Sequence, residues 1–135
     1  MSDQRKNISS GAPWEARVGY CRAVRLGNVI EVSGTVALRD GVLQFAGDPY
    51  GQAKVALEII GEALERAGAS LTDVVRTRMY VTDISHWEEV GRAHGEVFAE
   101  IRPATTMVEV SALIAPEMLV EIEATAVLTA DSSAV

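Results

Sequence analysis

The sequence predicts an α+β fold, in which a mixed β-sheet carries two helices on one face in a two-layer arrangement. Segments that alternate apolar and polar residues, as half-buried strands do, occur towards both ends of the 135-residue chain. Between them lie two longer segments whose apolar residues recur at helical spacing. Because strands flank and separate only two helices, we expect both helices to cover the same face of one sheet.

Two turn motifs predict two β-hairpins in the first third of the chain. Gly27-Asn28 separates the alternating segments 20–25 and 29–34, which favours a tight turn between antiparallel strands. Asp40-Gly41 is the second motif, and it predicts a small hairpin from the residues on either side of it.

Each expected helix has a start signal. Asp48-Pro49 supplies an N-cap side chain and a proline for the first helical position, and Gly68 marks the end of that helix. Ser85 and Glu88 have the spacing of a capping box, so the second helix is expected to begin there and to run to about residue 101. Its apolar side is expected to bury Trp87.

Three more strands are expected, one before the second helix and two after it. Residues 74–83 alternate, which places Val75 on an apolar face and Arg76 on a charged face. Proline disfavours helix, so Arg102-Pro103 opens a further strand that reaches Val110. The last strand covers residues 119–124.

The strands after the second helix carry three glutamates, and we expect them to share one side of the sheet: Glu109, Glu121 and Glu123. Buried carboxylates need water, a ligand or a countercharge, and cross-strand pairs with Arg76 or Arg78 would supply the last. The face is also too apolar to be a free surface, which favours an oligomer over a monomer.

The composition is typical of one folded domain and disfavours some classes of binding partner. Hydrophobic residues make up 48% of the chain and charged residues 23%, as in globular proteins. We expect a flexible arm over residues 1–12, a single domain over 13–129 and a tail over 130–135. The absence of a long apolar run or signal sequence and the single Cys21 predict a cytoplasmic protein without a membrane partner. The net charge of −7 disfavours nucleic acid.

The C-terminal part of the chain resembles a known family. The run Pro103-Ala104-x-x-x-Val108-Glu109-Val110, followed by Val120-Glu121-Ile122-Glu123-Ala124, is similar to the signature of the Rid family, the reactive intermediate deaminases also called the YjgF family. Gly19-Tyr20 and Val32-Ser33-Gly34 occur in the matching order, so the resemblance covers about residues 18–128. It implies a chorismate-mutase-like fold, a homotrimer with a small-metabolite cleft between subunits, and hydrolysis of enamines or imines to 2-oxo acids and ammonia.

The same resemblance implies the site residues. Glu121 would hold or activate the attacking water, Tyr20 would close the pocket, and the backbone near Ser33 and Gly34 would contact the ligand. No cofactor is expected. No metal is expected either, because the two histidines have no metal-ligand spacing and no cysteine cluster accompanies them.

Thr105 occupies the position at which active members carry an arginine that binds the substrate carboxylate. Met107 and Gly91, also expected to line the ligand site, replace a cysteine and an asparagine of the family. The chain therefore resembles a branch without the arginine. Arg102 is a candidate substitute, although an arginine at a helix C-terminus more often complements the carbonyl groups there. His94, on the apolar side of the second helix, is expected to be packed in the core or at an interface.

Two functions remain open from the sequence. One is hydrolytic deamination of an enamine or imine with Glu121 positioning water, and the alternative is a non-catalytic ligand-binding or regulatory trimer that uses the same cleft. A ribonuclease activity, sometimes attributed to the family, fits poorly with a charge of −7. Glu121 itself has a simpler interpretation, as one partner of a cross-strand ion pair.

Overall fold

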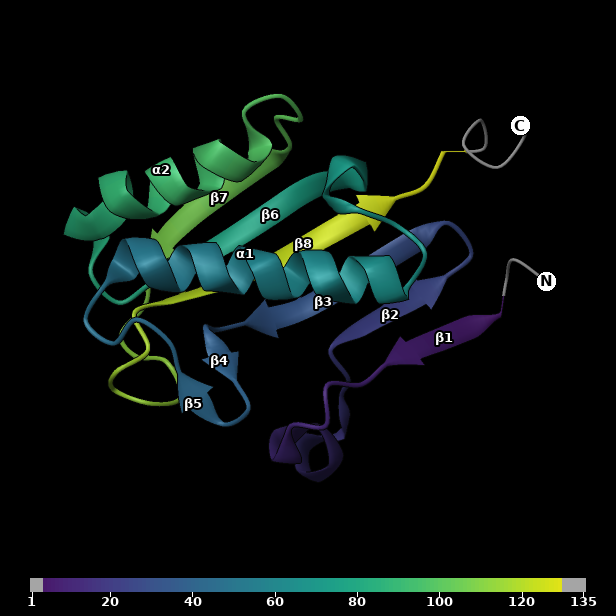
Figure 1. Cartoon of the computed structure of the whole chain (residues 1–135), viewed down its shortest axis with the longest axis horizontal. Helices are drawn as coiled ribbons and strands as arrows, with labels where there is room; N and C mark the ends of the chain where they lie inside the picture. Colours follow the sequence, from purple (N-terminus) through teal and green to yellow (C-terminus); the bar gives the residue numbers. More distant parts are fainter. Residues whose placement is uncertain (1–3, 130–135) are drawn as a thin grey trace.

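The computed structural model of the chain describes residues 4–129 and confirms the α+β fold class. Six strands form one mixed sheet in the order β1-β2-β3-β8-β6-β7, and β4 and β5 form a separate two-stranded sheet. Only β6 and β7 are parallel among the pairs of the six-stranded sheet in this range. Both helices lie on the same face of that sheet (Figure 1). The elements are β1 (Arg5–Ile8), β2 (Ala23–Leu26), β3 (Val29–Thr35), β4 (Leu38–Arg39), β5 (Val42–Leu43), α1 (Pro49–Arg66), β6 (Val74–Val81), α2 (Trp87–Phe98), β7 (Ala104–Glu109) and β8 (Val120–Val127).

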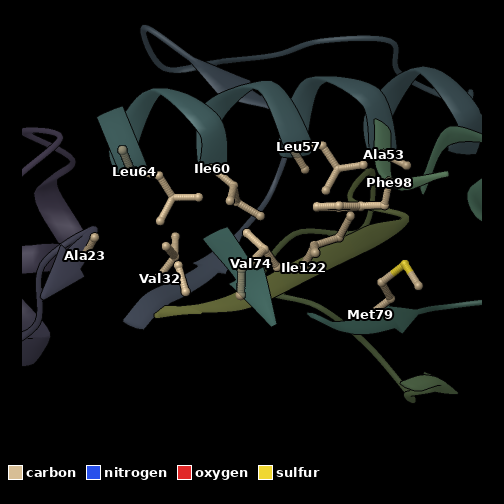
Figure 2. Packing of buried hydrophobic residues seen from close by; sticks show 14 of the residues in the cluster. Ala23, Val32, Ala53, Leu57, Ile60, Leu64, Val74, Met79, Phe98 and Ile122 are labelled. Atoms are coloured by element: carbon tan, nitrogen blue, oxygen red, sulfur yellow. The ribbon is translucent and has the colours of Figure 1, made fainter. Parts of the chain in front are cut away.

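The core lies between the helices and the sheet. Leu57, Ile60 and Leu64 point from α1 towards the sheet, where Val32 and Ile122 face them (Figure 2). Burial of such side chains contributes about 1.5–3 kcal/mol each relative to exposure. The helical spacing of the apolar residues therefore determines which face of α1 meets the sheet. The opposite face of the sheet is not covered by either α-helix of the described chain (Figure 1).

The predicted turns and the start of α1 are confirmed. Asp40 and Gly41 both have positive φ angles, 52° and 77°, as the tight turn between β4 and β5 requires. The Asp48 side chain accepts a hydrogen bond from Gly51 N at 3.1 Å, and Pro49 begins the helix. Gly68, with a φ of 92°, follows the end of α1 in the left-handed conformation that glycine adopts readily.

The N-terminal segment differs from the expected flexible arm. Arg5–Ile8 forms strand β1, which pairs antiparallel with β2. Ile8 is 3% exposed and belongs to the core. One buried side chain in a four-residue strand gives no alternation of apolar and polar residues by which the sequence could predict it. Arg66 Nη1, at the end of α1, donates a hydrogen bond to Ser9 O at 2.8 Å, which also attaches the N-terminal segment to the helix. The predicted tail, residues 130–135, lies outside the described residues.

Helix α2 begins two residues later than expected. Ser85 does not cap it, because the Asp83 side chain accepts from both Ser85 N and Ser85 Oγ, at 2.9 and 2.7 Å, and a 3₁₀ turn follows over Ile84–His86. The predicted capping box is therefore wrong. So is the predicted burial of Trp87, which is 56% exposed at the first position of the helix.

Strand β6 contains an irregularity that the alternating pattern concealed. Val74 pairs with Ala126 whereas Arg76 pairs with Thr125, so Val75 is an extra residue that bulges from the ladder. Val75 is 47% exposed, and its predicted place on the apolar face was wrong. From Thr77 onwards the alternation is regular, with every second side chain buried.

The three glutamates do not share one side of the sheet. Strand β6 lies between β7 and β8, and the register places Glu109 beside Val81 but Glu121 beside Tyr80. Neighbours in register point to the same face, so Glu109 and Glu121 point to opposite faces. The expected cross-strand pairing is confirmed for Glu123, whose Oε1 lies 3.6 Å from Arg78 Nη1.

Candidate functional site

A cavity of about 280 Å³ lies beside β3 and β8, on the side of Glu121. It brings together three residues of the expected site, Tyr20, Gly34 and Glu121. It also includes Trp14 and Arg22, which were not identified from the sequence. Drug-sized ligands occupy about 300–1,000 Å³, so a cavity of this size fits a small metabolite.

Glu121 is a half-buried carboxyl group near the start of strand β8. Burial raises the pKa of the Glu121 carboxyl above its ordinary value of 4.5. The positive charge of Arg22 lowers this pKa in part, and the negative charge of Glu123 adds to the increase. A carboxyl group with a raised pKa in a cavity is a candidate for general acid–base chemistry, because its protonation state changes closer to neutral pH.

Gly34 provides the space that the Glu121 side chain occupies. The register between β3 and β8 shifts between Val32 and Thr35, and this irregularity brings Gly34 close to Glu121. A Cβ atom at position 34 would lie 2.9 Å from Glu121 Cδ and closer still to its Oε2. With this backbone, the Glu121 carboxylate can therefore lie where it does only if residue 34 is glycine, which has no Cβ atom.

Arg22 connects the other residues of the cavity. Its Nη2 donates to Gly34 O at 2.8 Å, and its guanidinium carbon lies 5.9 Å from the centre of the Tyr20 ring. Arg22 lies two residues after Tyr20, and in extended chain such residues point to the same side. The two-residue spacing from Tyr20 was the one sequence signal that could have placed Arg22 in the site. Glu121 lies 99 positions further along the chain, so no local sequence pattern links Arg22 to Glu121.

The segment expected to be a flexible arm forms one wall of the cavity. Glu15, 6% exposed, accepts hydrogen bonds from Ser9 Oγ at 2.9 Å and from Ser10 N and Oγ. Burial alone would raise the pKa of the Glu15 carboxyl, but the bonds from Ser10 and Ser9 outweigh it and hold the pKa below 4.5. An ionised Glu15 thus fixes the start of a short π-helix, Glu15–Gly19, whose N-cap residue Trp14 lies in the cavity wall.

Ser33 lines a second cavity, of about 390 Å³, that adjoins the first at Tyr20. Its hydroxyl donates to Cys21 O at 2.7 Å, and the Cys21 thiol in turn lies 3.2 Å from Ala23 O. Both side chains are therefore engaged with the backbone of the β2 region. Within the described chain Ser33 supports the Tyr20 segment and does not reach the cavity of Glu121.

The remaining expected site residues lie elsewhere. Thr105 pairs with Thr77 in the β6–β7 ladder, on the face that the helices cover, and Gly91 belongs to α2. Met107 packs against the core on that same face. A single chain therefore separates two groups, one with Glu121 on the open face and one at the β7 edge.

A partly buried hydrogen-bonded chain ends at the exposed Thr105. Thr77 Oγ1 donates to Thr105 Oγ1 at 2.6 Å and lies 2.8 Å from His94 Nε2. Thr77 has one hydroxyl proton, so it accepts from a protonated Nε2. Burial lowers the pKa of His94, in agreement with a neutral ring packed 4.6 Å from the Phe98 ring. Arg102, exposed at the end of α2, lies near this group and not in the cavity of Glu121.

Residues 4–129 contain neither a candidate metal cluster nor a helix that could span a membrane. No three His, Cys, Asp or Glu side chains of this range are grouped so as to hold a metal ion. In the same range no helix has the length and apolar character needed to cross a membrane.

The fold and the cavity define a class of α+β proteins with two helices on one face of a mixed sheet and a carboxyl-containing cavity beside its strands. A family model described as Endoribonuclease L-PSP matches residues 10–128. The chain belongs to this family, which is the YjgF or Rid family indicated by the sequence motifs.

Solved structures and relatives agree with this assignment. Rv2704 of Mycobacterium tuberculosis, a member of the YjgF/YER057c/UK114 family, is 53% identical with a TM-score of 0.85, over 93% of this chain and 100% of the other. The YjgF gene product of E. coli is 32% identical with a TM-score of 0.79, over 92% and 99%. The 3-aminoacrylate deaminase RutC of Acinetobacter baylyi is 32% identical over 108 residues, 79% of this chain and 85% of RutC.

Proposed function

We propose that the protein hydrolyses a small enamine or imine to a carbonyl compound and ammonia, with Glu121 positioning and deprotonating the attacking water. The observation that carries this proposal is a half-buried Glu121 with a raised pKa in a metabolite-sized cavity. The relative RutC is named a 3-aminoacrylate deaminase, and 3-aminoacrylate is an enamine acid. The family description refers to an endoribonuclease, but a charge of −7 and a cavity of about 280 Å³ favour a small molecule over RNA.

The proposed reaction needs one carboxyl group and no change of oxidation state. An enamine first takes a proton on carbon and loses one from nitrogen to become the imine. The water oxygen forms a bond to the imine carbon while Glu121 accepts a proton from that water and returns it to the nitrogen. The hydroxyl group of this adduct then gives its proton to the nitrogen, again through Glu121, and the C–N bond breaks, so that ammonia leaves and the carbonyl group forms. Removing a base that acts in this way lowers rates by about 10²–10⁴-fold.

We further propose a cytoplasmic homotrimer, in which the β7 edge of one subunit lies next to the cavity of another. Support comes from the separation of the two groups of expected site residues within one chain, and from an edge strand on which Thr105, Thr106 and Val108 are exposed. This arrangement would allow Thr105 to contact a ligand held beside Glu121 of the neighbouring subunit. Light scattering on the purified protein would give the subunit number.

The test is ammonia release from 2-iminobutanoate generated in the assay, with the protein-free rate as the blank. We expect the wild type to release ammonia faster than the blank. Thr105→Arg, measured beside it, shows whether a cation at position 105 adds to the rate. An inert wild type with an active Thr105→Arg variant would mean that the cavity is competent but lacks a carboxylate contact. Rates at the blank for both proteins would contradict the proposal and favour the non-catalytic ligand-binding trimer.

A further inference from the structure

Arg22 is a cation in the cavity of Glu121 that has no carboxylate in contact. Among residues 4–129 no ion pair within 4.0 Å involves Arg22, whereas Arg39, Arg78 and Arg92 each have a glutamate partner. Glu15 and Glu121 influence Arg22 only through space. A guanidinium is charged at any physiological pH, so its position in a small cavity attracts an anion.

One nitrogen of the Arg22 side chain has no acceptor. Nε is the one buried side-chain nitrogen or oxygen atom without a hydrogen-bond partner in the described part of the chain. Arg25 of β2 differs, because its Nε donates to Gly27 O at 2.9 Å and its Nη1 to Ala67 O at 2.8 Å. A buried donor without an acceptor is costly, and the cost is larger for a charged group. An anionic ligand in the cavity would supply acceptor oxygens to this guanidinium.

The geometry places this anion contact next to the proposed reaction centre. Gly34 separates the two groups, since its carbonyl oxygen accepts from Arg22 while its Cα lies against the Glu121 carboxylate. A ligand whose carboxylate is bonded directly to the reacting carbon would meet Arg22 and Glu121 on either side of Gly34. The Tyr20 ring beside the guanidinium restricts its orientation and favours the cation.

We propose that Arg22 is the specificity-determining residue of this cavity and that it binds the carboxylate of a small 2-oxo or 2-imino acid. A guanidinium offers parallel N–H donors to the two oxygens of a carboxylate, which neither Tyr20 nor Thr105 provides. The inference rests on the proposed function for the role of the cavity. It places the carboxylate contact on the same face of the sheet as Glu121, whereas Thr105 lies on the other face of its own chain.

The test is equilibrium binding of 2-oxobutanoate to the purified full-length protein by isothermal titration calorimetry, with the uncharged 2-oxobutanamide as the matched ligand. Arg22→Gln is expected to weaken 2-oxobutanoate binding by about 10- to 100-fold and to leave 2-oxobutanamide binding unchanged. Arg22→Lys keeps the charge but loses the planar pair of N–H donors, so its affinity for 2-oxobutanoate is expected to lie between those of the wild type and Arg22→Gln. Arg25→Gln is the control, because it makes the same substitution in β2 at a residue outside this cavity. Circular dichroism shows that each variant is folded.

The possible results separate this inference from the proposed function. Equal affinity of wild type and Arg22→Gln for 2-oxobutanoate, or no saturable binding to the wild type, overturns the role of Arg22. Ammonia release that Arg22→Gln leaves unchanged overturns it as well, while the proposed function stands. Arg22-dependent binding without any ammonia release supports the role of Arg22 and contradicts the hydrolytic reaction.

Discussion

Gly34→Ala is expected to lower kcat/KM for ammonia release by about 100-fold or more, because the added methyl group occupies the position of the Glu121 carboxylate. Gly34 does not have a positive φ angle, so alanine adopts the same backbone without strain. The carboxylate is the end of a flexible side chain and must turn away. The variant should therefore remain folded while Glu121 loses its position relative to the substrate.

The measurement compares steady-state rates of Gly34→Ala with those of Gly95→Ala. Gly95 lies inside α2, and a Cβ atom there would have no neighbour within 4 Å. Gly95→Ala should keep the wild-type rate and stabilise the helix by about 0.5–1 kcal/mol. Unchanged activity in Gly34→Ala would show that the observed position of Glu121 is not the one that the reaction uses.

Glu121→Gln is expected to lower the rate of ammonia release by about 10²–10⁴-fold and, at the same time, to increase stability at neutral pH. Glutamine has nearly the same shape but cannot accept the proton from water. Burial raises the pKa of Glu121 in the folded protein above 4.5, so ionisation of this group opposes folding. Between pH 4.5 and the raised value the folded state binds more protons than the unfolded state, and stability falls as the pH rises through this window.

Chemical denaturation of both proteins at pH 4 and pH 7 measures this effect. The stability of Glu121→Gln minus that of the wild type should be larger at pH 7, since only the wild type carries the charge there. Arg22, Glu123 and Tyr80 surround position 121 in both proteins, so their other contributions to stability largely cancel in the difference. The acidic limb of the wild-type rate profile should also lie above pH 4.5. A stability difference independent of pH would indicate a Glu121 with an ordinary pKa and weaken its assignment as the base.

The parts of the fold that the sequence predicted correctly depend on a few adjacent residues. Asp40-Gly41 and Asp48-Pro49 determine a turn and a helix start through their own backbone and side-chain geometry. Strand β1 was missed because its partner in the sheet lies about 20 residues away and Ile8 is its one buried side chain. The strand order, with β6 between β7 and β8, likewise depends on contacts between distant segments, which is why Glu109 was assigned to the wrong face.

The candidate site also combines features that the sequence predicts with features that depend on contacts between distant segments. Family motifs indicated Tyr20, Gly34 and Glu121, and the structure places these three in one cavity. The role of Arg22 could not be predicted from the sequence, because it depends on an unpaired Nε and on a glutamate from the distant strand β8. The distance of Thr105 from that cavity also follows only from the strand register.

The most direct test of the cavity as a reaction site is a crystal structure of the protein with 2-oxobutanoate, the product of the proposed reaction on 2-iminobutanoate. We predict that the ligand lies between Tyr20, Arg22 and Gly34, with its carbonyl carbon facing the Glu121 carboxylate. A ligand bound only in the neighbouring cavity at Cys21 and Ser33, or at the β7 edge without contact to Glu121, would contradict the proposed site.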